Sequence, residues 1–123
     1  MSEGYLKLNE LLPYRSAIEL GRDCWKIYES MNWEVKKIIG SQFITAVDSI
    51  GTNIAEGYGR FHFLDRIKFY YNARGSLVEA KHWMLLLKER NFITEELFIE
   101  LIEKTNILNK EINTYIKACR PKE

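Results

Sequence analysis

The sequence predicts an all-α protein, an antiparallel up-down-up-down four-helix bundle, and three observations support that prediction. Apolar residues recur at steps of three and four over long segments, which is the spacing of one helix face. Both prolines, Pro13 and Pro121, stand near the chain ends, so no helix-breaking ring interrupts the stretch between them. Short connectors join the segments, which makes successive helices antiparallel.

The helices are expected within a single domain of residues 1–123, and their approximate bounds are 13–32, 34–57, 63–89 and 94–118. Pro13 suits the first turn of the first helix. Asn32 ends that helix and can cap the second, and Thr94 is the expected cap of the fourth. These helix-start and capping residues stand where the periodic apolar segments begin or end.

Each of the three later helices has an apolar seam. The second has Val35, Ile38, Ile39, Phe43, Ala46, Ile50, Ile54 and Gly57 on one broad face. The third has Ile67, Tyr70, Ala73, Leu77, Ala80, Met84 and Leu87. The fourth has Leu97, Leu101, Thr105, Leu108, Ile112, Tyr115 and Cys119. These seams are the expected core of the bundle.

The third helix carries a second apolar line, with a basic line between the two. The second line is Leu64, Tyr71, Val78 and Leu85, and the basic line is Arg74, Lys81 and Lys88. A helix with two apolar faces buries both when a second surface covers the outer one, so the sequence predicts a homo-oligomer. The alternative is a central helix whose basic stems lie over apolar neighbours.

Composition limits the function classes. The net charge of +1 argues against strong non-specific nucleic-acid binding but leaves room for a local basic patch. Cys24 and Cys119 have no metal-ligand spacing and are expected to be reduced packing residues. No signal peptide and no membrane-length apolar run is recognised, so we expect a cytoplasmic protein without a membrane contact.

No catalytic, metal or cofactor site is predicted. The glycines of residues 49–60 follow a helix and lack the pattern of a phosphate loop. Glu79 and His82 have the Glu-x-x-His spacing of di-iron bundles, but the other histidine, His62, is preceded three positions earlier by Gly59 rather than a glutamate. No nucleophile is paired with a base, so we expect a non-enzymatic protein.

The stretch SIGTNIAEGYGR, residues 49–60, is interpreted as the end of the second helix. Gly57 and Gly59 are expected to adopt positive φ there. Asn53 and Glu56 are expected to accept hydrogen bonds from the free amides at the start of the third helix. A ligand or nucleic-acid role for Asn53 and Glu56 is the alternative interpretation.

Basic residues follow that stretch, and those proposed to contact nucleic acid are Arg60, Arg66, Arg74, Lys81 and Lys88. In a symmetric oligomer they would be multiplied into a ring or groove that attracts phosphates. The alternative is that they are ordinary solvated charges.

Two motifs together carry a family resemblance. Residues 49–60, with Asn-Ile-Ala-Glu-Gly at 53–57, and ARGSLVE at 73–79 resemble the paired signature of the bacterial 23S rRNA intervening-sequence proteins. The resemblance implies a four-helix bundle that forms a homopentamer and has no established biochemical function. The family is also similar to accessory proteins of diversity-generating retroelements, which are thought to bind nucleic acid and reverse transcriptase.

We expect architectural roles for six residues of the two motifs, which are Asn53, Glu56, Gly57, Gly75, Ser76 and Glu79. Gly75 and Ser76 are expected to let helices approach closely. The family commonly has a basic pair where Ile44 and Thr45 stand here, which weakens the nucleic-acid hypothesis for this chain. Two hypotheses stay open: an oligomeric scaffold that contacts RNA or DNA, and a protein–protein adaptor that binds no nucleic acid.

Overall fold

Residues 8–120 are described by the structure, which is a computed structural model. They form an all-α bundle, which confirms the predicted fold class, and no strand occurs within this range. The long helices are α2 (Leu12–Ser30), α4 (Ser41–Tyr58), α5 (Phe63–Glu89) and α6 (Glu95–Cys119). A short helix α3 (Trp33–Val35) and a π-helical turn η1 (Lys36–Gly40) precede α4.

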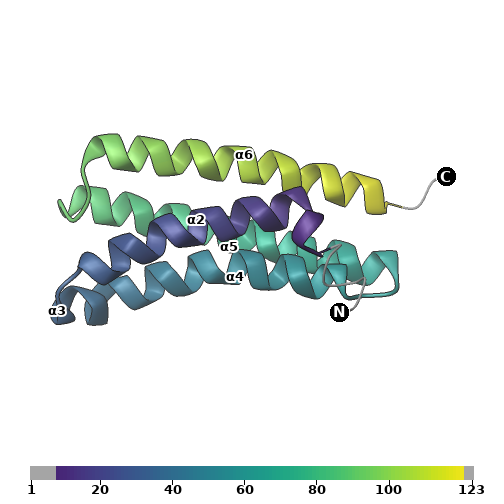
Figure 1. The fold of residues 1–123 in the computed structure, drawn as a ribbon, viewed down its shortest axis with the longest axis horizontal. Coiled ribbons are helices and arrows are strands. Elements are labelled where there is room, and N and C mark those ends of the chain that lie inside the picture. The colour runs from purple at the N-terminus through teal and green to yellow at the C-terminus, as the bar shows by residue number, and fades with distance from the viewer. Residues whose placement is uncertain (1–7, 121–123) are drawn as a thin grey trace.

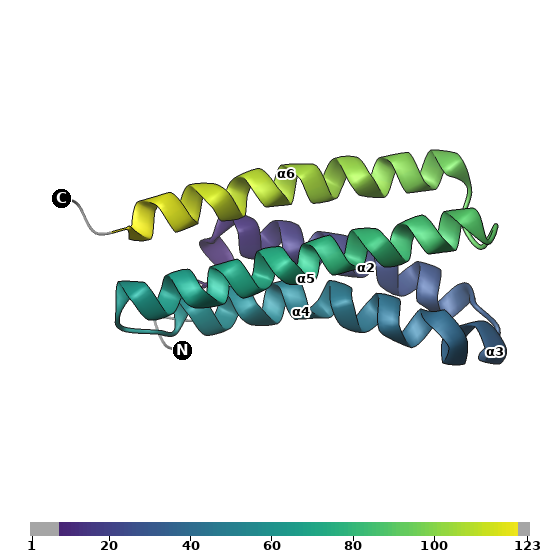
Figure 2. The ribbon, with the colours of Figure 1, turned by 180° about the vertical axis from the view of Figure 1, so that it is seen from behind.

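The four long helices lie side by side along the long axis of the molecule (Figures 1 and 2). Helix α5 packs against α4 and α6, and α2 packs against the same two helices. Helices α2 and α5 are therefore diagonal partners. The α4–α5 connection lies at one end of the bundle, and α3 lies at the other end together with the α5–α6 connection (Figure 1).

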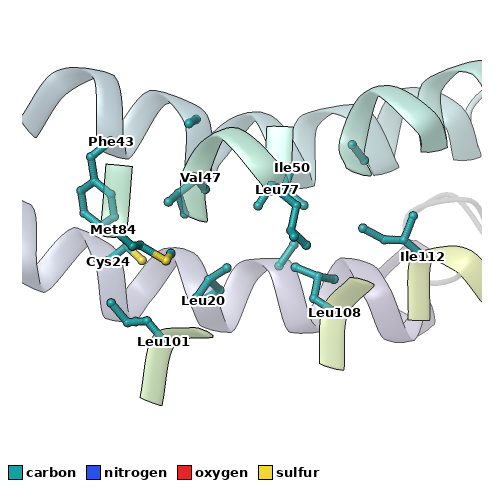
Figure 3. Close-up of a cluster of buried hydrophobic side chains, with 14 of the residues drawn as sticks. Leu20, Cys24, Phe43, Val47, Ile50, Leu77, Met84, Leu101, Leu108 and Ile112 are labelled. Carbon is teal, nitrogen blue, oxygen red and sulfur yellow. The ribbon is translucent and has the colours of Figure 1, made fainter. Parts of the chain in front are cut away.

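The core runs the length of the bundle and is built from the predicted seams. Figure 3 shows Phe43 and Met84 near Cys24, with Leu101 on the opposite side of the cluster. All seam residues of α5 are buried except Ile67, which packs partly buried against the core. Cys24 and Cys119 are free buried thiols, as predicted.

Two of the expected caps are present with normal hydrogen-bond geometry. The Asn32 side chain accepts the backbone N–H of Val35 at 3.0 Å, and the Thr94 hydroxyl accepts that of Leu97 at 3.1 Å. Each satisfies an amide that the first turn of a helix leaves without a backbone partner.

The predicted second helix is not uniform, because η1 interrupts its α-helical geometry. In a π-helical turn one extra residue is accommodated, so the inward face shifts by one position. Ile38 was predicted on the apolar face but is 65% exposed, whereas Ile39 is 1% exposed. Periodicity at a fixed angle per residue does not detect such a shift.

Candidate functional site

The motif at 53–57 lies on α4, and its glycine faces α5. A Cβ added at Gly57 would stand 2.7 Å from Cε1 of Tyr70 and 3.2 Å from the carbonyl oxygen of Arg66. Close helix approach therefore explains Gly57. The predicted positive φ is wrong for Gly57 and Gly59, because no described glycine has positive φ.

Asn53 and Glu56 do not cap α5, so this expectation is also wrong. The Asn53 side-chain amide donates to the carbonyl of Ser49 at 2.9 Å, and Glu56 pairs with Arg60 at 3.2 Å. The N-cap of α5, His62, makes no side-chain cap bond. Because α4 continues to Tyr58, both side chains still project from helical backbone and find partners one turn away.

The second motif, residues 73–79, lies on α5, and only some of its residues are buried against other helices. Gly75 is exposed, and nothing in the described chain lies within 4 Å of a Cβ added there. The expected close approach at Gly75 is thus not found within one protomer. Ser76 is partly buried, and Glu79 accepts a hydrogen bond from the indole N–H of Trp83 at 3.2 Å. Glu79 thus has a local partner on α5 itself.

Two members of the predicted basic set, Arg60 and Arg66, lie beside the α4–α5 connection. The Arg60 guanidinium lies 4.6 Å from the ring centroid of Phe69 in addition to its pairing with Glu56. Arg66 donates from Nε to the carbonyl of Arg60 at 2.6 Å. Both side chains hold the connection against α5.

The other three members, Arg74, Lys81 and Lys88, form a ladder from α5 to α6. Arg74 donates to Asn113 Oδ1 at 2.7 Å, and Lys81 donates to Asn106 Oδ1 at 2.8 Å. The two donors are seven residues apart on α5 and their two acceptors are seven residues apart on α6, in the reverse order expected for antiparallel helices. The Lys88 ammonium completes the line 5.0 Å from the ring centroid of Phe98.

The outer face of α5, defined as Leu64, Tyr71, Gly75, Val78 and Leu85, is open to solvent. Leu64 is 70% and Val78 61% exposed, although both are large apolar side chains. This is the second apolar line that the sequence indicated. Gly75 lies within it, and an exposed mid-helix glycine costs about 1 kcal/mol relative to alanine. Among residues 8–120, no atom lies close enough to Gly75 to explain why glycine is needed there.

A second apolar surface, which sequence reasoning missed, lies between α2 and α4. This α2–α4 groove has a volume of about 360 Å³ and is lined by Ala17, Ile18, Gly21, Arg22, Trp25, Val47, Asp48 and Gly51. Ile18 and Trp25 are 39% and 48% exposed. Their seven-residue spacing was the available signal. Burial in this region raises the pKa of Asp48.

The described part of the chain contains no cluster of side chains that could bind a metal ion. Among residues 8–120, no three side chains of His, Cys, Asp or Glu gather closely enough to hold an ion. Each helix within residues 8–120 is too short or too polar to span a bilayer.

Comparison with known proteins bears on the family and the fold. The family model described as 23S rRNA-intervening sequence protein matches residues 9–114. No curated protein matches the chain. A crystal structure of a protein of unknown function from the S23 ribosomal protein family of Bacteroides thetaiotaomicron is similar, with a TM-score of 0.80 and 23% identity. The similarity covers 86% of this chain and 96% of that one, and it concerns the fold alone. Because the family model spans most of the sequence, this chain belongs to the 23S rRNA-intervening sequence protein family.

Proposed function

We propose that this protein is a non-enzymatic, cytoplasmic helical-bundle scaffold that works as a homo-oligomer. The outer face of α5 is the observation that carries this proposal. It presents four large apolar side chains at seven-residue spacing, each at least 38% exposed. A contiguous row of exposed apolar side chains is typical of a surface that another protein covers. A partner helix would also use the space beside Gly75.

The α2–α4 groove is the complementary surface. Its lining includes the small residues Ala17, Gly21 and Gly51, which leave room for side chains from another copy. Because α2 and α5 are diagonal partners, the face and the groove are different surfaces of the protomer. A contact between them is heterologous, and repetition of such a contact closes into a ring when the rotation allows it. The family resemblance implies five copies.

Light scattering tests the assembly. The wild type is expected at a multiple of 14.6 kDa, and five copies are the expected number. Val78→Glu on the face and Ile18→Glu on the groove should each weaken assembly, since both bring a charge into an apolar contact. Ile99→Glu, which changes a 51% exposed residue of α6, is the matched control.

A mixture of the two variants makes the test specific. Each mutant copy retains one intact surface, so Val78→Glu and Ile18→Glu chains should form a one-to-one dimer when mixed. An isologous interface gives no such recovery. A wild type of 14.6 kDa at all concentrations would overturn the proposal.

Contact with RNA or DNA through the predicted basic set is the second candidate, and a protein–protein adaptor without such contact is the alternative. The geometry favours the adaptor, because Arg74 and Lys81 already bond to α6 and Lys88 lies over Phe98. Arg60 directly precedes the exposed Phe61 in the chain, and the Arg66 guanidinium lies 5.6 Å from the ring centroid of the exposed Phe63. If the basic set contacts phosphate, Arg60→Ala should weaken nucleic-acid binding and reduce its dependence on salt. If Arg60→Ala changes neither the affinity for nucleic acid nor its salt dependence, the protein–protein adaptor is the better-supported function.

A further inference from the structure

Aromatic and basic side chains gather at the end of the bundle that carries α3. A concavity of about 290 Å³, here termed the α3 pocket, is lined by Tyr28, Trp33, Lys36, Lys37 and Ser41. The Lys36 ammonium lies 5.0 Å from the ring centroid of Tyr28, and that of Lys37 lies 5.1 Å from the ring centroid of Trp33. Trp33 is 71% exposed, so most of its surface is available to a ligand.

The π-helical turn η1 shapes the α3 pocket. Lys36 and Lys37 begin the turn, and buried Ile39 and Gly40 end it. A Cβ added at Gly40 would stand 2.8 Å from Sδ of Met31 and 3.3 Å from Cδ1 of Tyr28, so glycine allows both side chains to lie against the turn. The Tyr28 ring is thereby placed beside Lys36, and Trp33 precedes Lys37 by one helical turn. Single π-helical turns within α-helices are frequent at functional sites.

The charge balance of the α3 pocket favours an anion. Within residues 8–120, neither Lys36 nor Lys37 has a carboxylate within 4.0 Å, whereas Arg60, Lys88 and Lys104 each form an ion pair. Glu29 and Glu34 are exposed near this end but pair with neither lysine in that range. Two ammonium groups together with the exposed Trp33 ring match the two parts of a nucleotide, a phosphate and a flat base.

We propose that the α3 pocket binds single-stranded nucleic acid, with one base stacked on Trp33 and adjacent phosphates held by Lys36 and Lys37. A single strand exposes the faces of its bases, whereas a duplex hides them in the stack. Two neighbouring lysines suit the repeated phosphates of a strand. The pocket shares no residue with the predicted basic set and does not depend on self-association.

Fluorescence anisotropy of a short end-labelled oligothymidylate tests the stacking contact. The wild type is expected to bind at about 50 mM salt and to release the strand as salt rises. Trp33→Ala should lower the affinity by about fivefold or more, the loss expected for one base–aromatic stack. Phe61→Ala is the matched control, because Phe61 is 87% exposed and belongs to the α4–α5 connection, which lies at the opposite end of the bundle from α3 (Figure 1). Thermal unfolding establishes that each variant is folded.

The salt dependence tests the phosphate contacts. The double variant Lys36→Ala/Lys37→Ala removes two phosphate partners, so the slope of log affinity against log salt should become shallower by about 1.4. Lys26→Ala/Lys110→Ala removes the same charge from exposed positions outside the pocket and should leave the slope unchanged. Equal effects of the two double variants would mean that net charge alone attracts the strand, which overturns the proposal.

Three further outcomes would overturn the assignment. The first is the absence of any anisotropy change with the wild type. The second is an equal loss in Phe61→Ala, which would place the contact at the α4–α5 end. The third is equal affinity for thymidine monophosphate or for a duplex, which would exclude a strand-specific site. The Val78→Glu variant should bind the strand as the wild type does, so failure of the pocket and failure of the assembly are distinguishable.

Discussion

The contact between Gly57 and Tyr70 makes Gly57→Ala a sharp test of the packing between α4 and α5. The new methyl group would lie 2.7 Å from Cε1 and 2.9 Å from Cδ1 of Tyr70, and 3.2 Å from the carbonyl oxygen of Arg66. Tyr70 is 3% exposed, so its ring has little room to move away. The added methyl group cannot turn away from the ring either, because the backbone carbonyl of Arg66 on α5 lies beside it.

The expected loss combines two opposed effects. Overpacking a closed site costs about 1–3 kcal/mol. Replacing glycine by alanine in a helix returns up to about 1 kcal/mol. The net expectation for Gly57→Ala is a loss of roughly 1–2 kcal/mol in the free energy of unfolding. For a chain of this size, the melting temperature should fall by about 4–8 °C.

Urea unfolding followed by far-UV circular dichroism measures this loss. The Val78→Glu background keeps assembly from contributing to the apparent stability. Gly75→Ala is the control, because nothing lies within 4 Å of the added methyl group. The control should gain up to about 1 kcal/mol. A Gly57→Ala protein as stable as its parent, or a control that is equally destabilised, would refute the packing explanation.

The remaining predictions concern helix caps and alkaline pH. Thr94→Ala should cost about 1 kcal/mol of unfolding free energy and His62→Ser should not, because α6 has a side-chain cap and α5 has none. Equal losses in urea unfolding would contradict this assignment. Burial raises the pKa of Cys24 from 9.0 to about 12 and that of Tyr70 from 10.0 to about 12, so the unfolded chain releases these protons first. The contribution of these two groups to the free energy of unfolding should be fully present below pH 9 and should decrease as the pH rises towards 12. Each group loses about 1.4 kcal/mol per pH unit once the pH exceeds its own unfolded-state pKa. Tyr70→Phe should abolish the decrease in unfolding free energy that begins at pH 10. A urea midpoint that stays constant above pH 9 in the wild type would contradict the reasoning.

The local features were the ones most open to prediction. Asn32 and Thr94 cap the helices they were expected to cap, because a cap depends only on a side chain and an amide three residues later. The seam of α5 was readable for a similar reason, since helical spacing alone decides which side chains share a face. The exposed outer face of α5 followed from the same spacing. The α2–α4 groove had a weaker signal, the seven-residue step from Ile18 to Trp25.

The sequence by itself determined that this chain is an all-α bundle, where its helices begin, and that α5 has two apolar faces, because these properties follow from neighbours along the chain. Only the tertiary structure decided what contacts those faces. It explained Gly57 by the ring of Tyr70 and brought Arg74 and Lys81 to hydrogen-bond partners on α6. It left Gly75 without a packing neighbour among residues 8–120. It also revealed η1, which turned Ile38 outward and placed Lys36 and Lys37 beside aromatic rings. The physical reason is that such contacts depend on how helices pack against one another, which residue spacing along one helix does not encode.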